Sequence, residues 1–295
     1  MISINKPTLL EERTVRMTRN KSFNGANPVL YLIATPIGNL KEMSPRALKV
    51  INEMDIIAAE DTRNAFSLLA NYGIKKELYS LREHNEVEAS KHLLEKIKAG
   101  KKVAYMSDAG YPCISDPGHL LVQEMIKNNI NVSTISGSSA FINALVASGL
   151  ETKHFFFYGF LSPKENEAKE ELVALKNLRD TIILYEAPHR IMKTLNLLRE
   201  VLGNRYICLA RELTKLNEEY IRGNLDELLE IDEATIKGEI VLIIEGNKDK
   251  TIISDDDIKD RVAYFVNLGL SQKDAIGVVA EEFKINKNYV KKLVF

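Results

Sequence analysis

The chain has 295 residues and a mass of 33.3 kDa, and its hydrophobic content of 45% excludes general disorder. Forty basic and forty-one acidic residues give a net charge of -1, which argues against nucleic-acid binding through overall positive charge, although a local basic face stays possible. Cys113 and Cys208 form no C-x-x-C pair and no cluster with histidine, so the sequence predicts neither a disulfide scaffold nor a bound metal. No apolar run approaches the ~18–20 residues of a membrane helix, and no secretory signal is evident, so we expect a soluble cytoplasmic protein.

Residues 1–27 differ in composition from the rest of the chain. Residues 1–21 contain five basic and two acidic residues, and their apolar periodicity is weak. We predict a flexible N-terminal extension; a basic arm that touches RNA is the alternative. A second methionine, Met17, precedes the first predicted strand and is an alternative start.

Short apolar runs alternate with helical patterns between residues 28 and 150, which predicts an N-terminal α/β domain. Ser44-Pro45 indicates a helix start, and Gly73 and Gly100 indicate helix ends. We expect strands at 29–34, 55–59, around 78, 102–106 and 131–135. We expect helices at 45–52, 62–71, 86–99, 119–127 and 138–148.

The alternation continues over residues 151–250, the predicted C-terminal α/β domain. We expect strands at 154–158, 181–185, 206–210 and 239–245, a further short element at 220–222, and helices at 165–178, 189–201 and 226–230. Residues 251–295 predict a helical appendage of helix-turn-helix type, with helices at 255–268, 271–283 and 287–293. Its seven acids balance seven bases from 255 to 295, so a solvated helix face and an RNA contact through its lysines both stay open.

Unusual residues gather in the loops after the predicted strands, where open α/β sheets bind ligands. The first loop, 34–40 (ATPIGNL), is either a simple turn or a turn whose backbone donors hold a ligand. Two polar segments follow the next strands: 60–63 (EDTR) and 82–86 (REHNE). Each is either a helix cap with a local salt bridge or a source of catalytic side chains. Neither a Rossmann G-x-G-x-x-G nor a P-loop motif occurs, which argues against common NAD and NTP enzymes.

Residues 107–118 (SDAGYPCISDPG) carry the most specific signal. Ser-Asp-x-Gly occurs twice there together with two prolines, directly after a predicted strand. Such a loop keeps carboxyl and backbone groups exposed at the sheet edge and favours a functional role. Residues 185–190, 210–215 and 237–239 flank strands of the second half in the same manner, which predicts two halves that face each other across a cleft.

Eight motifs stand in order across residues 34–246: ATPIGNL, AEDTR, REHNE, SDAGYPCISDPG, FFFYGFL, YEAPHR, ARELTK and KGEIVLIIEG. The chain thereby resembles the ribosomal RNA small subunit methyltransferase I family, within the tetrapyrrole-methylase (class III) superfamily. GLSQKDA and KNYVKK resemble that family's C-terminal helices. The resemblance implies an α/β fold with two α/β domains of the tetrapyrrole-methylase type, a cleft between them and a small C-terminal helical appendage.

The resemblance further implies transfer of a methyl group from S-adenosyl-L-methionine to a cytidine 2′-hydroxyl in the decoding region of 16S rRNA. It implies a homodimer that acts on 16S rRNA or the small ribosomal subunit, without a metal or a membrane. The implied cofactor-binding residues are Pro36, Ala109, Gly110, Tyr111, Ile114, Ser139, Ala140, Glu186 and Ala210. Where the family shows a Pro-Gly-Pro-Ser-Ala turn, residues 136–140 read Ser-Gly-Ser-Ser-Ala, and the loss of both prolines should loosen that turn.

A ribose hydroxyl must lose its proton at or near methyl transfer, so a carboxylate or histidine should lie beside it. Asp61, Glu83, His84 and Asp108 are candidates, and we favour Asp108 or His84.

The expected RNA contacts are Arg63, His189 and Arg190, with surface salt bridges as the alternative reading. Two other functions stay open: a tetrapyrrole (uroporphyrinogen or precorrin type) C-methyltransferase on the same fold, and a non-enzymatic nucleic-acid binder that uses the C-terminal helices.

Overall fold

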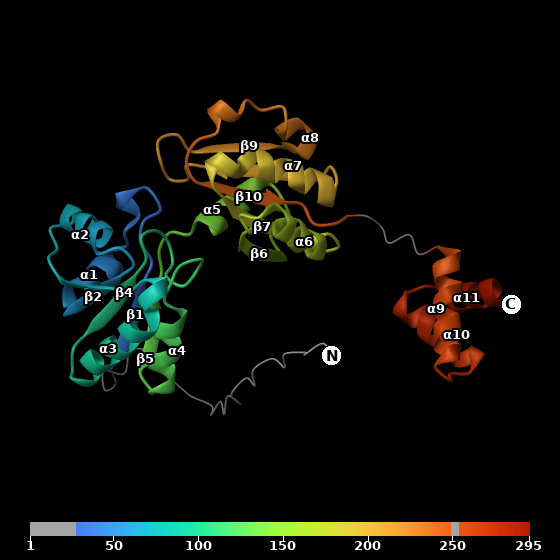
Figure 1. Cartoon of the computed structure of the whole chain (residues 1–295), viewed down its shortest axis with the longest axis horizontal. Coiled ribbons are helices and arrows are strands. Elements are labelled where there is room, and N and C mark those ends of the chain that lie inside the picture. The colour runs from blue at the N-terminus through green and yellow to red at the C-terminus, as the bar shows by residue number, and fades with distance from the viewer. Residues whose placement is uncertain (1–27, 249–253) are drawn as a thin grey trace, which may run out of the picture. The chain divides into compact units, whose positions relative to one another are not determined.

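The computed structural model describes residues 28–248 and 254–295 (Figure 1). The predicted N-terminal extension, the alternative start and the predicted boundary between residues 250 and 251 lie outside these ranges. Two compact units divide between Gly246 and Asn247, and each is described by itself. Within the described ranges, no helix has the length and apolarity needed to cross a membrane.

The first unit holds two five-stranded sheets. The first sheet is wholly parallel, in the order β3-β2-β4-β1-β5. Its strands are β1 (Val29–Ile33), β2 (Ile56–Ala59), β3 (Glu77–Ser80), β4 (Val103–Met106) and β5 (Asn131–Ile135). Four helices cover it: α1 (Pro45–Glu53), α2 (Thr62–Asn71), α3 (Glu86–Lys98) and α4 (His119–Lys127).

The two faces of this sheet carry separate cores. α3 and α4 pack on one face and α1 and α2 on the other (Figure 1). Every residue of β2 and β4 is buried, which explains their unbroken apolar runs: a strand covered on both faces has no solvent side on which to place polar residues.

The second sheet has the order β6-β7-β10-β8-β9 and is mixed, since only β6 runs parallel to its neighbour β7. Its strands are β6 (Phe155–Phe160), β7 (Thr181–Glu186), β8 (Tyr206–Arg211), β9 (Glu219–Asn224) and β10 (Ile240–Ile244). One face is covered by α6 (Glu165–Leu175), α7 (Ile191–Leu202) and α8 (Leu225–Leu228).

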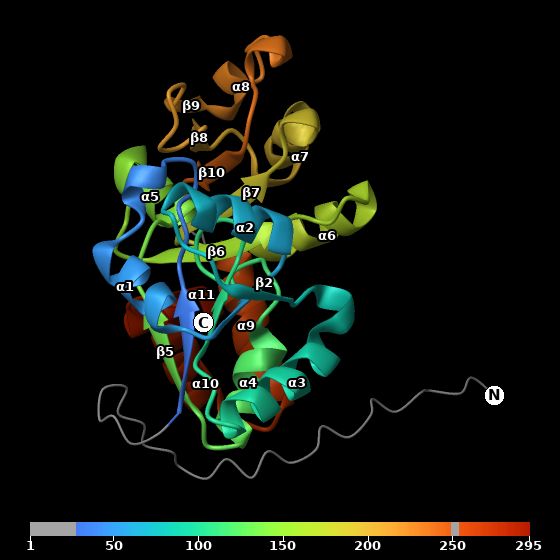
Figure 2. The ribbon, with the colours of Figure 1, turned by 90° about the vertical axis from the view of Figure 1, so that its left-hand side faces the viewer.

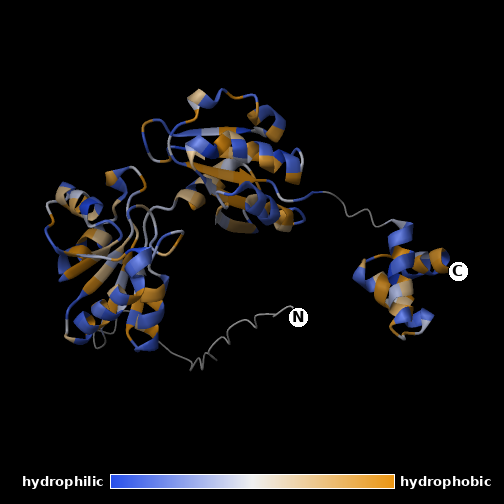
Figure 3. Ribbon diagram, in the orientation of Figure 1, coloured by the Kyte–Doolittle hydropathy of each residue, from blue (hydrophilic) through white to orange (hydrophobic). Residues whose placement is uncertain are grey.

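The other face of the second sheet is covered by α5 (Ala140–Ser148), which follows the last strand of the first sheet. Figure 2 shows β10 and its neighbours between α5 and α7. Ala144 and Leu145 of α5 and Ile37 of the first loop share a core with Ile183 and Val241 of the second sheet. The first loop and α5 therefore share an apolar core with the second sheet. Figure 3 shows hydrophobic residues in orange along the strands of that sheet.

Single-turn 3-10 helices occur at η1 (Leu40–Glu42), η2 (Glu83–Asn85), η3 (Pro188–Arg190) and η4 (Glu233–Thr235). The second unit consists of α9 (Asp255–Asn267), α10 (Gln272–Glu282) and α11 (Lys287–Val294) around a core that includes Ile258, Ile276 and Val290. Ser254 and Asp257 form a capping box at the start of α9.

Every predicted helix and strand is present, and the α/β fold class is confirmed. Five boundaries were wrong by two or three residues. The helix expected from 138 begins at Ala140, and the helix expected to end at 230 ends at Leu228. The other three have local reasons. The helix expected from 189 begins at Ile191, because Pro188–Arg190 form a 3-10 turn. The helix expected to end at 178 ends at Leu175, and the strand expected to end at 158 continues to Phe160 through an irregularity in its pairing with β7.

Glu86, a buried carboxylate at the start of α3, caps a different helix. Its Oε1 accepts hydrogen bonds from the backbone N–H groups of Gly118 (2.9 Å) and Leu120 (2.7 Å), at the N-terminus of α4. The N-cap residue of α4 is Gly118, which has no side chain that could accept these hydrogen bonds. The carboxylate satisfies helix donors that would otherwise be unpaired and anchors the end of the 107–118 loop.

We expect Glu86→Ala to lower the free energy of unfolding by about 1–3 kcal/mol, because two buried donors lose their acceptor. Glu86→Gln keeps one acceptor oxygen and should lose less. Urea denaturation followed by circular dichroism measures both, and Glu88→Ala, at an exposed position of the same helix, is the control. Equal destabilisation by Glu86→Ala and Glu88→Ala would contradict the capping role.

Candidate functional site

The strand ends that the sequence singled out lie at shared sheet edges. All strands of the first sheet are parallel, so the loops after β1, β2, β4 and β5 leave from one edge. In the second sheet, Ile240 at the start of β10 pairs with Glu186 at the end of β7 and Arg211 at the end of β8. The polar motifs of the second half are therefore also collected at one edge.

The 107–118 loop is tied to the first loop through main-chain hydrogen bonds. Thr35 donates to the carbonyl of Gly110 at 2.9 Å and accepts from its N–H at 3.1 Å. The Thr35 hydroxyl adds a bond to the carbonyl of Ser107 at 3.3 Å. These contacts occupy both backbone polar groups of Gly110, so a ligand beside that residue would meet it through close packing rather than through hydrogen bonds.

The same loop holds two non-glycine residues in the left-handed region, Cys113 (φ 69°) and Ser115 (φ 61°). Such residues cost conformational energy, and they persist where surrounding contacts hold them. One such contact is the Tyr105 hydroxyl, which donates to the carbonyl of Pro117 at 2.8 Å. At Gly118 an added Cβ would lie 2.5 Å from the Tyr105 ring, so only glycine fits there.

The turn before α5 is held from both sides although it lacks the family's two prolines. The backbone N–H of Gly137 donates to the Tyr111 hydroxyl at 3.2 Å, and the Ser138 hydroxyl donates to Glu42 at 2.7 Å. A Cβ at Gly137 would lie 3.0 Å from Ala34. Hydrogen bonds and close packing thus supply restraint that proline supplies elsewhere.

Four carboxylates gather at the ends of β2 and β4. Asp108 accepts from the backbone N–H of Asp61 at 3.3 Å and from the side-chain amide of Asn64 at 2.6 Å. Glu60 and Asp116 belong to the same group, since, after burial, the charge of Asp108 raises the pKa of Glu60 and the charge of Glu60 raises the pKa of Asp116. The sequence prediction included Asp61 and Asp108 but missed the other two. The repeated Ser-Asp-x-Gly pattern was the available signal for Asp116, since it places a second aspartate in the same loop.

The environment separates the proton affinities of these carboxylates. Burial, followed by the charge of Glu60, raises the pKa of Asp116 from 3.8 to about 6. Burial, followed by the charge of Asp108, also raises the pKa of Glu60. Hydrogen bonds from Arg63 lower the pKa of Asp61. A carboxylate with a pKa near neutrality is suited to exchange a proton under physiological conditions.

The two other predicted bases, Glu83 and His84, lie in the exposed turn η2. Neither forms a hydrogen bond with the carboxylate group among the described residues. Within those residues, no cluster of three or more histidine, cysteine, aspartate or glutamate side chains could hold a metal ion.

The predicted cofactor residues fall on both halves of the first unit. Pro36 and Gly110 are buried in the two bonded loops, while Ala109 and Ile114 are exposed. Ser139 precedes α5 and does not cap it with its side chain, so the first N–H groups of α5 stay available for an anionic ligand group. The remaining predicted residues of the first half are Tyr111 and Ala140, both half-buried.

On the second sheet, Glu186 and Ala210 are both buried. The Glu186 carboxylate accepts from the Thr194 hydroxyl (2.5 Å) and from the N–H of Ala187 (2.7 Å), and pairs with Arg190 (3.3 Å). The Glu186 carboxylate is therefore fully occupied by residues that follow β7 in the chain. A ligand at this position would contact the backbone of Glu186.

An unsatisfied hydroxyl marks the place where the two halves touch. Thr214 Oγ1 is buried and has no hydrogen-bond partner within the described residues. A Cβ added at Gly38 of the first loop would lie 3.1 Å from that oxygen and 2.6 Å from the Lys215 side chain. A polar ligand or water reaching this oxygen would satisfy it. The small loop residues and this orphan oxygen fit a polar small-molecule cofactor.

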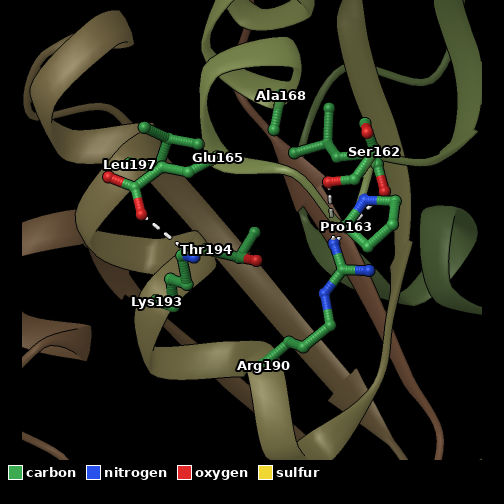
Figure 4. A pocket seen from close by; sticks show the side chains of 9 residues that line it. Ser162, Pro163, Glu165, Ala168, Arg190, Lys193, Thr194 and Leu197 are labelled. Carbon is green, nitrogen blue, oxygen red and sulfur yellow. Dashed lines mark hydrogen bonds and ion pairs between the residues drawn. The ribbon is translucent and has the colours of Figure 1, made fainter.

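The predicted RNA contacts differ in availability. Arg63 and His189 are both exposed. The Arg63 side chain is 83% exposed and forms an ion pair with Asp61. Arg190 lines a small pocket at the end of β6, where it donates to the carbonyls of Leu161 and Ser162 (Figure 4). Because Arg190 also pairs with Glu186, it holds the second sheet's edge together in this structure.

Comparison with known proteins identifies the fold of the chain. Residues 29–229 match the family described as Tetrapyrrole (Corrin/Porphyrin) Methylases. Among solved structures, the methyltransferase CobJ superposes with a TM-score of 0.57 at 16% identity, over 77% of this chain and 97% of that one. Uroporphyrin-III C-methyl transferase from Thermus thermophilus, solved with S-adenyl homocysteine, has a TM-score of 0.51 at 17% identity, over 74% of this chain and 97% of that one. The chain therefore has the tetrapyrrole-methylase fold.

Relatives with similar sequences identify the family of the chain within this fold. Ribosomal RNA small subunit methyltransferase I of Bacillus subtilis is 40% identical over 93% of this chain and 97% of its own length. The protein of the same name from Haemophilus influenzae is 43% identical over 88% of this chain and 94% of its own length. The chain belongs to the ribosomal RNA small subunit methyltransferase I family.

Asp116 should cost stability when it is ionised. Its folded-state pKa of about 6 lies above the ordinary 3.8, so the folded protein binds this proton more tightly than the unfolded chain does. The contribution of Asp116 to stability therefore falls as pH rises between these two values. We expect Asp116→Asn to melt at a higher temperature than the unsubstituted chain at about pH 7.5, with a smaller difference at about pH 4.5.

Thermal unfolding at the two pH values measures this difference, and Glu53→Gln removes one charge from an exposed site as the control. A destabilised Asp116→Asn variant at the higher pH would show that Asp116 is stabilised by a partner and not strained by its neighbours.

Proposed function

We propose that the chain transfers a methyl group from S-adenosyl-L-methionine to the 2′-oxygen of a cytidine in the decoding region of 16S rRNA. Family membership over nearly the whole chain supports this proposal most strongly. The tetrapyrrole alternative rests on structures that share 16–17% identity with this chain, and likeness at that level concerns the fold and not the acceptor. We further propose that the enzyme works as a homodimer, in the cytoplasm, where 16S rRNA or the small subunit is available.

The cofactor supplies an activated methyl group whose transfer needs little electrophilic assistance. The chain must therefore do two things: hold the reacting atoms in line and take up the proton of the ribose hydroxyl. For the first, we propose that the loops around Pro36, Ala109 and Ser139 hold the cofactor. The free N–H groups at the start of α5 suit its carboxylate, and the Thr214 hydroxyl suits one of its polar groups.

For the proton, we propose a carboxylate of the 107–118 loop as the base. Asp108 is oriented by two hydrogen bonds, and Asp116 has a pKa close to the working pH. His84 stays a candidate that lacks such positioning. Arg63 and His189 are the proposed contacts to RNA phosphates, because both are exposed close in sequence to strand ends of the site.

The base can be identified by single-turnover methylation. We expect Asp108→Asn to lower the rate about 100-fold or more, since general-base catalysis contributes at least that much. His84→Ala should lower it less than about tenfold. The unsubstituted enzyme should lose activity as pH falls through about 6, where Asp116 takes up a proton. Glu88→Gln, at an exposed position of α3, is the matched control.

An Asp108→Asn variant with a normal rate would remove that residue from the mechanism. A flat pH profile between about pH 5 and 8 would remove Asp116, because a base with its pKa cannot stay ionised across that range.

The acceptor is tested with methyl-labelled S-adenosyl-L-methionine. Small ribosomal subunits and naked 16S rRNA, both from a strain that lacks the gene, are incubated separately with the enzyme. We expect label on a decoding-region ribose in at least one of them, and reactions without enzyme serve as the control. Cofactor binding without label on either RNA would overturn the acceptor assignment and move the tetrapyrrole alternative forward.

A further inference from the structure

Phe160 ends the edge strand β6 with 54% of its surface exposed. It belongs to the motif FFFYGFL, to which the chemistry above assigns no role. A single exposed phenylalanine is ordinary in itself. Here, however, an irregularity in the strand determines which way the ring faces.

That irregularity is a β-bulge. The pairing register between β6 and β7 shifts between Phe157 and Gly159, so Tyr158 is an extra residue in the strand. Gly159 has a φ of 87°, which glycine adopts without penalty. After the bulge, Phe160 pairs with Tyr185.

The bulge exchanges the faces of the two residues that follow it. Regular alternation from Phe157 would turn Phe160 into the core under α6 and α7 and Leu161 to the opposite face. Instead, Leu161 is 3% exposed within that core. Phe160 lies on the opposite face together with Phe157 and Tyr185. The Tyr185 ring contacts the rings of both phenylalanines.

A series of aromatic contacts supports the exposed ring. The Phe141 ring of α5 stacks on Phe157 with centroids 4.6 Å apart. Phe157 meets Tyr185 edge-on at 5.1 Å, and Tyr185 meets Phe160 at 5.4 Å. The Phe160 ring is thus held in place on one side, while more than half of its surface stays open.

The bulge also borders the carboxylate loop. A Cβ at Gly159 would lie 3.4 Å from Ser115 Oγ. Burial raises the pKa of Tyr185 to about 12, and the Asp116 carboxylate adds to that rise, so Asp116 lies within electrostatic reach of Tyr185. Phe160 therefore stands beside the loop that carries the proposed base.

We propose that Phe160 stacks against the base of the acceptor nucleotide, supported by Tyr185, and so positions the ribose for methyl transfer. This inference rests on the proposed function. A nucleotide that offers its 2′-oxygen to an enzyme leaves its helical stack, and an aromatic ring replaces the lost stacking. The acceptor base is a better occupant than the cofactor, because the cofactor positions implied on this sheet, Glu186 and Ala210, are 3% and 0% exposed.

The chain contains no tryptophan, so a substituted one is a unique fluorescent reporter. We expect Phe160→Trp to stay active and its fluorescence to be quenched by whichever RNA, naked or in the subunit, the unsubstituted enzyme methylates. S-adenosylhomocysteine alone should leave the signal unchanged. Phe156→Trp is the matched control, since Phe156 is 42% exposed on the same strand but on the opposite face, and it corrects for absorption and background.

Kinetics give the second readout. Phe160→Leu should lower kcat/KM for the RNA about fivefold or more, mainly through KM, because leucine offers no stacking surface. Its affinity for S-adenosyl-L-methionine and its melting temperature should match those of Phe156→Leu.

Three results would overturn the role of Phe160: an unchanged kcat/KM in Phe160→Leu, equal quenching of both tryptophans, or a weakened affinity for the cofactor with normal RNA kinetics. All three leave the proposed function standing, because the unsubstituted enzyme still methylates RNA in the same assay. Absence of methylation by that enzyme would instead overturn the proposed function itself.

Discussion

The partial burial of carboxylates beside one another at one sheet edge is the constraint on which the site depends. Asp108 and Asp116 belong to one loop, and Glu60 reaches them from another strand end. Burial, followed by neighbouring carboxylate charge, raises the pKa values of Glu60 and Asp116, so ionisation of these two groups is disfavoured. The surrounding loops must hold these groups in place. The paired hydrogen bonds of Thr35 with Gly110 and the capping carboxylate of Glu86 do so from opposite ends of the loop.

This restraint also explains why the loop tolerates Cys113 and Ser115 in the left-handed region. Relaxing either residue would move the backbone between two fixed ends, one bonded to the first loop and one fixed at the start of α4. The backbone strain and the raised pKa of Asp116 therefore have a common origin: packing that holds groups where they would not settle by themselves. Such a cost is expected where position matters more than stability.

The sequence predicted what depends on neighbours along the chain. Continuous apolar runs gave the buried strands, and Ser44-Pro45 gave a helix start, because burial on both faces and capping leave direct marks on residue order. It also predicted that polar loops gather at strand ends. Missed features depend on residues far apart in sequence. The raised pKa of Asp116 depends on burial and then on the charge of Glu60, and the orientation of Phe160 depends on a register shift against β7.

Helix α5 shows how the two halves of the first unit depend on each other. It follows the last strand of the first sheet, but Ala144 and Leu145 pack on the second sheet. The second sheet therefore buries a helix that the first half leads into, and Ile37 of the first loop joins the same core. The turn that leads into α5 is bonded to Tyr111 and Glu42 of the first half. The helix N-terminus proposed to receive the cofactor is consequently anchored from both sides, and a ligand bound there is positioned relative to both sheets at once.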